Sequence, residues 1–130
     1  MVRTSFDFSD ITREEDFARM LNRRMQQAAW NNVRVVSFNV ERRIKIKMPV
    51  DTGRARASWG HSTAPASPAD GIWIEDEHNL AITQGSAVEY IEQLNEGSSQ
   101  QAPAGFIDAE ERAGAEELSQ KIADDMARLF

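Results

Sequence analysis

A single stripe of apolar residues constrains this chain most. Apolar positions recur every three or four residues through the N-terminal part of the sequence, which is the spacing of one face of an α-helix. The stripe consists of Phe17, Leu21, Met25, Ala28 with Ala29, Val33, Val36, Val40 and Ile44. Asp10 or Thr12 is a candidate N-cap, and Pro49 disfavours helix at Met48 and ends it. The pattern therefore predicts one long helix from about Glu14 to Met48.

The second half of this stretch also carries a strand signal. It is rich in β-branched residues, and the segment IKIKM alternates as a strand does. We favour helix because the helical spacing is unbroken over roughly 30 residues. Such a helix would be about 50 Å long, whereas a domain of this size has a radius of gyration of about 14 Å. We therefore expect it to kink, break or project, with a second subunit covering a projecting apolar face.

The remaining sequence predicts a small sheet and two further helices. A turn at Asp51-Thr52-Gly53 leads into RARASWGHS, which we expect to be a strand. Further along come strands at 72–74 and 80–83 joined as a hairpin, a short helix at 87–94 and a last helix from Asp108 to about Arg128. The predicted fold class is α+β: a long N-terminal helix, a small antiparallel sheet of three to four strands, a short helix and a C-terminal helix.

Length and composition place limits on this fold. The chain has 130 residues, which fits a single domain over 1–130, with residues 1–10 expected to be flexible. The absence of cysteine excludes disulfides, Cys-ligated zinc, iron–sulfur clusters and thiol nucleophiles. No apolar run approaches the ~20 residues that span a bilayer, and the first residues turn acidic too early for a secretory signal peptide. We expect a protein made in the cytoplasm, with no membrane association and no cofactor.

The charge is unevenly distributed along the chain. The formal net charge is −6, but residues 1–60 carry 12 Lys and Arg against 7 Asp and Glu, while residues 61–130 carry 3 against 14. Such a split is expected of a molecule that associates head to tail with copies of itself or with charged neighbours. It is equally expected of two halves that each expose a solvated face of one sign.

The sequence gives no support for catalysis. Its glycines are too far apart for a phosphate-binding loop. His61 and His78 could join Asp51, Asp76 or Glu77 around a metal, but no HExxH-like spacing is present, and solvated surface histidines are the better interpretation. Ser58 lacks the GxSxG nucleophile elbow. We therefore predict that the protein is not an enzyme and has no metal site.

A basic cluster is the best candidate for a binding surface. Six cations lie close together in the sequence: Arg42, Arg43, Lys45, Lys47, Arg54 and Arg56. They could contact phosphates or an acidic protein. No exposed aromatic residues alternate with them and the net charge is negative, so we favour a protein partner, or DNA passing through an assembled pore, over a free DNA-binding module. A solvated helix end remains the alternative.

Two segments carry a more specific signal. They are MPVDTGRARASW at 48–59 and VEYIEQLNEGSSQQAPAGFIDA at 88–109. In this order they resemble the putative tail-component family of long-tailed bacteriophages, whose members are also called tail-completion or neck proteins. The matching residues are Pro49, Val50, Asp51, Thr52, Gly53, Arg54, Arg56 and Ser58, then Tyr90, Gly97, Ser98, Ala102, Pro103, Gly105 and Phe106. Two departures affect the local register: Ala55 replaces a leucine, and Glu92 and Glu96 compete for one acidic position.

The resemblance implies a virion structural protein at the head–tail interface. It would act as a ring of six copies, contacting a tail terminator on one side and a head-completion or stopper ring on the other, with DNA threading the lumen. A tail terminator or head-side adaptor ring is the first alternative. A small DNA-binding accessory protein that uses the basic helix is the second.

The motif residues also have architectural roles that follow from their chemistry. Pro49 ends the helix, and Gly53 is suited to positive φ in the turn that reverses the chain. Asp51 or Thr52 can accept hydrogen bonds from the free N–H groups of that turn. Pro103 and Gly105 shape the start of the last helix, and Phe106 is expected to anchor it against the sheet. We assign Tyr90 and Gly97 to the same structural motif.

Overall fold

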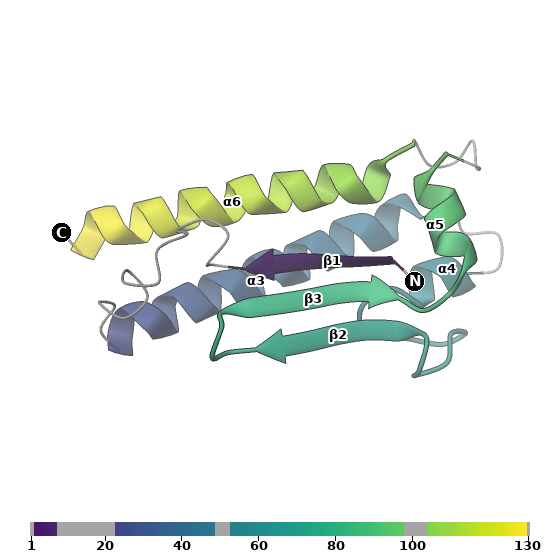
Figure 1. The fold of residues 1–130 in the computed structure, drawn as a ribbon, viewed down its shortest axis with the longest axis horizontal. Helices are drawn as coiled ribbons and strands as arrows, with labels where there is room; N and C mark the ends of the chain where they lie inside the picture. The colour runs from purple at the N-terminus through teal and green to yellow at the C-terminus, as the bar shows by residue number, and fades with distance from the viewer. Residues whose placement is uncertain (1, 8–22, 49–52, 98–103, 130) are drawn as a thin grey trace.

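The protein is a mixed helix-and-strand domain (Figure 1). The computed structural model describes residues 2–7, 23–48, 53–97 and 104–129. Its elements in chain order are β1 (Val2–Asp7), α3 (Arg23–Lys47), α4 (Arg54–Ala57), β2 (Gly71–Asp76), β3 (Ala81–Ser86), α5 (Tyr90–Asn95) and α6 (Phe106–Leu129). The predicted α+β class is therefore confirmed.

The long helix is present, and it is covered within the chain. Val33, Val36, Val40 and Ile44, which all belong to the apolar stripe, are fully buried in α3. This confirms helix over strand for the ambiguous half of the stripe. At ~1.5 Å per residue α3 is about 37 Å long, and α6 runs antiparallel beside it while the sheet lies on another side (Figure 1). The expectation of a projecting helix that needs a second subunit to cover this stripe is thus wrong for residues 23–48; residues 14–22 lie outside the described residues.

The sheet differs from the prediction in its strands. Its order is β1-β3-β2 with both pairs antiparallel, and the β2–β3 hairpin is the predicted one. Only these two of the predicted strands are present. The other strand is β1, which pairs with β3 from Val2↔Ser86 to Asp7↔Ala81. The expectation that residues 1–10 are flexible is therefore wrong for residues 2–7.

The segment expected to be a strand after Gly53 is instead the short helix α4. The backbone N–H of Ala57 donates to the carbonyl of Gly53 at 3.0 Å, and that of Ser58 donates to Arg54 at 2.9 Å. Alanine and arginine are strong helix formers, so the alternation of RARA carried no strand preference. The helical turn buries Ala55 and Ala57 against the core.

One buried polar residue connects three elements. Gln84, fully buried on β3, accepts a hydrogen bond from Trp59 Nε1 at 2.8 Å and donates through Nε2 to the carbonyl of Ser37 on α3, also at 2.8 Å. Next to it, Ser58 Oγ and Ser86 Oγ lie 2.9 Å apart. Because buried polar groups are costly when unpaired, these bonds fix how the sheet sits on α3 and on the segment after α4.

Asn95 caps the last helix, and sequence analysis did not single it out. Its carbonyl accepts from Gly105 N–H at 2.5 Å, and its Oδ1 accepts from Ile107 N–H at 2.9 Å. Its Nδ2 donates to Asp108 Oδ2 at 3.1 Å. The end of α5 therefore supplies acceptors for free N–H groups at the start of α6, and Phe106 is buried in the core as expected.

Gly53 should tolerate no bulky replacement. Its φ is +74°, which confirms the predicted positive φ, and a Cβ there would meet Pro65 only at ordinary contact distance. The cost therefore comes from the backbone, and Gly53→Val should lower the free energy of unfolding by about 1–3 kcal/mol. Thermal or urea unfolding measures this loss. Gly53→Asn is the control, since asparagine tolerates the left-handed region and should cost clearly less; equal stability of all three proteins would contradict the assignment.

Asn95→Ala should remove the cap on α6. We expect a loss of about 1–2 kcal/mol in the free energy of unfolding, because the side chain accepts from the Ile107 N–H and donates to Asp108, whereas the bond from Gly105 N–H to the backbone carbonyl of residue 95 remains. Gln93→Ala, at an exposed position of the same helix, should change stability by less than ~0.5 kcal/mol. Denaturant unfolding of the three proteins makes the comparison, and matching midpoints for the two variants would argue against the cap.

Candidate interaction surface

The six cations of the predicted basic cluster do not form one surface. Four of them lie on α3, whose helical positions point them in different directions, and Arg54 and Arg56 lie on α4. They divide into a seam with α6, a groove beside α4 and one exposed arginine.

The seam between α3 and α6 takes up Arg43 and Lys47. Arg43 Nε lies 2.7 Å from Glu110 Oε2 and its Nη2 lies 3.2 Å from Glu117 Oε2, while Lys47 Nζ pairs with Glu110 Oε1. Asn39 and Asn32 add bonds to Glu117 and Asp125 along the same seam, at 3.0 and 2.6 Å. Part of the basic first half of the chain is thus neutralised by the acidic second half within one molecule.

Glu110 is the most buried member of this seam, at 5% exposure. Burial alone would raise the pKa of its carboxyl group, but hydrogen bonds and charge from Lys47 and Arg43 outweigh burial and hold that pKa below its ordinary value. The same carboxylates raise the pKa of the Arg43 guanidinium against the opposing effect of burial. The carboxylate is therefore ionised at neutral pH and bound to two cations.

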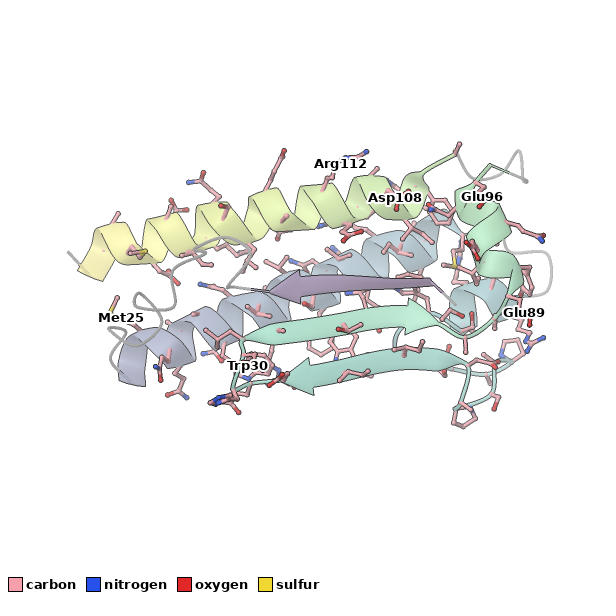
Figure 2. All side chains as sticks on the ribbon, viewed as in Figure 1. Met25, Trp30, Glu89, Glu96, Asp108 and Arg112 are labelled. Carbon is pink, nitrogen blue, oxygen red and sulfur yellow. The ribbon has the colours of Figure 1, made fainter. Side chains whose placement is uncertain are left out.

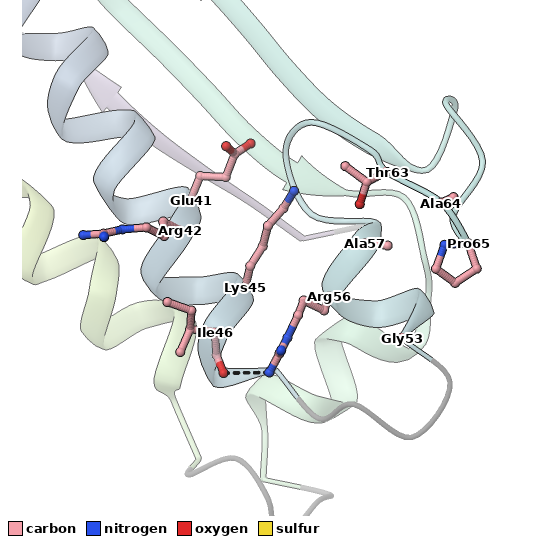
Figure 3. Close-up of a pocket in the computed structure, with 10 residues that line it drawn as sticks. All are labelled: Glu41, Arg42, Lys45, Ile46, Gly53, Arg56, Ala57, Thr63, Ala64 and Pro65. Atoms are coloured by element: carbon pink, nitrogen blue, oxygen red, sulfur yellow. Dashed lines mark hydrogen bonds between the residues drawn. The ribbon is translucent and has the colours of Figure 1, made fainter.

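A groove of about 550 Å³ lies between the C-terminal end of α3, α4 and the loop through Pro65 (Figure 3). Arg56 extends across its base and donates through Nη2 to the carbonyls of Ile46 and Met48 at 3.0 and 3.2 Å. This arginine therefore caps the end of α3, where backbone carbonyls lack helical partners.

Lys45 and Arg54 are engaged around the same groove. Lys45 Nζ donates to the carbonyl of His61 at 2.6 Å, and burial lowers the pKa of its ammonium group. Arg54 Nε lies 3.5 Å from Asp70 Oδ2. Only Arg42, exposed on α3, has neither an ion pair nor a side-chain hydrogen bond to any other residue in the described part of the chain.

An aromatic cluster adjoins this region. The rings of Phe38 and Trp73 lie 4.8 Å apart, and the ring of His61 lies 4.3 Å from Trp73 and 5.6 Å from Phe38. Glu41 Oε2 holds the histidine, at 2.8 Å from Nδ1 and 2.7 Å from its backbone N–H. Each ring therefore contacts the other two, and a carboxylate also holds the histidine.

Large apolar side chains remain exposed beside this cluster. On α3, Val35 is 47%, Phe38 40% and Ile46 62% exposed. Together with Arg42 they follow one line along the helix at steps of three and four residues. We call Val35, Phe38, Arg42 and Ile46 the outer face of α3. Sequence analysis missed this face because its apolar residues lie outside the stripe that forms the core.

The structure locates the family-like motif residues in part. Gly53, Gly97 and Gly105 all have positive φ, and a Cβ on Gly97 would come within 2.9 Å of Ala104. Tyr90 is half-buried at the start of α5 and packs against the core. Pro49, Asp51, Thr52 and Pro103 lie outside the described residues. Of the roles predicted for the described members, the positive φ of Gly53 is present.

Comparison with known proteins identifies no family for this chain. No protein-family model, no curated protein and no solved structure matches this chain. Among residues 2–7, 23–48, 53–97 and 104–129, no group of three or more His, Asp or Glu side chains is placed to hold a metal ion. No helix in the same described parts is long and apolar enough to cross a membrane.

The seam predicts a specific dependence of stability on pH. Because the pKa of Glu110 is lowered in the folded protein, its contribution is complete above the pKa of an unfolded glutamate (about 4.3) and is lost as the pH falls through the folded value. Glu110→Gln should lower the free energy of unfolding by about 1–3 kcal/mol at neutral pH. The difference from the wild type should shrink as the pH falls below about 4. Urea unfolding at several pH values tests this; a constant difference would show that the carboxylate charge plays no part.

Proposed function

We propose that this protein is a virion structural protein of a bacteriophage neck, a tail-completion ring component that joins the tail to the DNA-filled head without catalysing a reaction. The resemblance of two segments of the sequence to the tail-component family suggested this role. The observation that carries it is the outer face of α3, where exposed apolar side chains flank an arginine that has no charged partner among the described residues.

The composition of this face supports a protein partner. Exposed apolar side chains grouped on one face are typical of interaction sites, and aromatic residues and arginine carry much of the binding energy in protein interfaces. Phe38 already stacks on Trp73 within the chain, which reduces the side-chain freedom it would lose when a partner packs on it. In a neck, the partners would be further copies of the chain and the tail-terminator and head-completion rings, at the head–tail interface of the virion.

Contact with DNA is less well supported. Five of the six cations have partners within the chain: Arg43, Lys47 and Arg54 pair with carboxylates, and Lys45 and Arg56 donate to carbonyls. Three of the six charges are thus offset by carboxylates, which reduces the electrostatic attraction that phosphate binding requires. This weakens the alternative of a DNA-binding accessory protein. A tail terminator or head-side adaptor would need a similar protein-binding face and remains the nearer alternative.

Arg42→Glu tests the proposed role. Position 42 is exposed, so the variant should unfold within ~0.5 kcal/mol of the wild type, yet fail to join heads to tails when it replaces the wild-type chain in the phage that encodes it. Electron microscopy of the lysate would then show separate heads and tails. Glu77→Arg is the control, with a charge change of equal size at an exposed position of the turn between β2 and β3, and should assemble normally.

Full complementation by Arg42→Glu would contradict the role given to this face. Absence of the wild-type chain from purified particles would contradict the proposed function itself. Arg43→Glu is unsuitable for this test, because it would place a carboxylate against Glu110 and Glu117 and destabilise the fold directly.

A further inference from the structure

We propose that the outer face of α3 binds the exposed side of α6 in a second copy of this chain, so that the contact between copies is α3 against α6 and not α3 against α3. The inference deepens the proposed function and rests on it in using the same surface. It adds the identity of the partner and of the partner's surface.

The charge on α3 argues against its pairing with itself. Arg42 lies at the middle of the outer face, between Phe38 and Ile46, and Lys45 lies beside it. Glu41, the carboxylate next to it, is turned toward His61 and is engaged there. A symmetric α3–α3 contact would bring arginines together with no carboxylate between them, and juxtaposed like charges oppose association.

The exposed side of α6 offers the complement. One line of its exposed positions, at steps of three and four residues, consists of alanines with a carboxylate and an amide at the middle: Ala109, Ala113, Glu116, Gln120, Ala123 and Ala127. These residues are all exposed, and Glu116 makes no ion pair with another described residue. We call them the outer face of α6. The seam with α3 uses other positions, namely Glu110, Glu117 and Asp125, so this face stays available in the folded chain.

Charge and shape agree across the proposed contact. α6 carries seven carboxylates against three cations, and three of these carboxylates, Asp108, Glu116 and Asp124, are exposed. The bulky side chains of α3 would enter the spaces between alanines, which is how the ridges of one helix fit the grooves of another. Arg42 would then meet Glu116, each supplying the charge that the other lacks.

The outer face of α6 is also long enough to receive the outer face of α3. The outer face of α3 spans 35–46, about 17 Å along the helix, and that of α6 spans 109–127, about 27 Å. The outer face of α3 therefore fits within the length of the outer face of α6. Because the contact joins two different surfaces, it either repeats around a ring or closes as a pair in which both contacts form at once.

A charge-swap experiment on the full chain tests this pairing. The mass of purified protein is measured by analytical ultracentrifugation over a range of concentrations for the wild type, Arg42→Glu, Glu116→Arg and the double variant. We expect the wild type to self-associate and each single variant to associate at least about tenfold more weakly. The double variant, and an equimolar mixture of the two single variants, should recover association, because each contact again joins opposite charges.

A control variant and a check of folding accompany these measurements. Glu77→Arg, which changes charge in the turn between β2 and β3, should associate as the wild type does, and thermal unfolding confirms that all variants are folded. A wild type that stays monomeric at every concentration, single variants that associate normally, or a charge swap that fails to restore association would each overturn the proposal. A protein that associates as described but is missing from virions would leave this contact intact and refute only the proposed function.

Discussion

The rest of the structure depends on the burial of one side of α3. Val33, Val36, Val40 and Ile44 have no exposed surface, and both α6 and the sheet pack on this helix. Full burial of each such side chain contributes about 1.5–3 kcal/mol, so the stripe supplies much of the core. The polar bonds then fix the arrangement: Gln84 joins the sheet to α3, and Glu110 joins α6 to it. The apolar contacts hold the elements together, and these bonds set their register.

The basic residues of α3 lie in two different environments. On one side of α3, Arg43 and Lys47 meet carboxylates of α6 inside a single molecule. On another side, Arg42 remains exposed among apolar residues. Internal pairing of this kind contributes little net stability, because desolvation offsets much of the attraction. The charged residues that this pairing leaves unpaired lie on separate faces of the molecule. Such an arrangement favours association in one orientation over a general attraction to anions.

Much of the fold was predictable from the sequence, and the failures have physical causes. The helical spacing identified α3 and α6, and the hairpin turn located β2 and β3. β1 was missed because it pairs with β3, a segment far away in the sequence, and VRTSFD by itself does not predict that pairing. Asn95 was missed because its partners lie across the loop that follows α5. The basic cluster was seen as one surface because spacing alone does not say which side of α3 receives α6.

The position of β1 in the sheet has a consequence for how the protein is made. β3 is the central strand, yet it comes much later in the sequence than β1. The elements α3, α4 and β2 all lie between the two strands in chain order (Figures 1 and 2). The β2–β3 hairpin closes a short loop, whereas Val2 must wait for Ser86. During synthesis on the ribosome, β1 is thus made well before the strand with which it pairs. Until the two strands pair, the edge of β3 is open, and a strand from another nascent chain could take the place of β1.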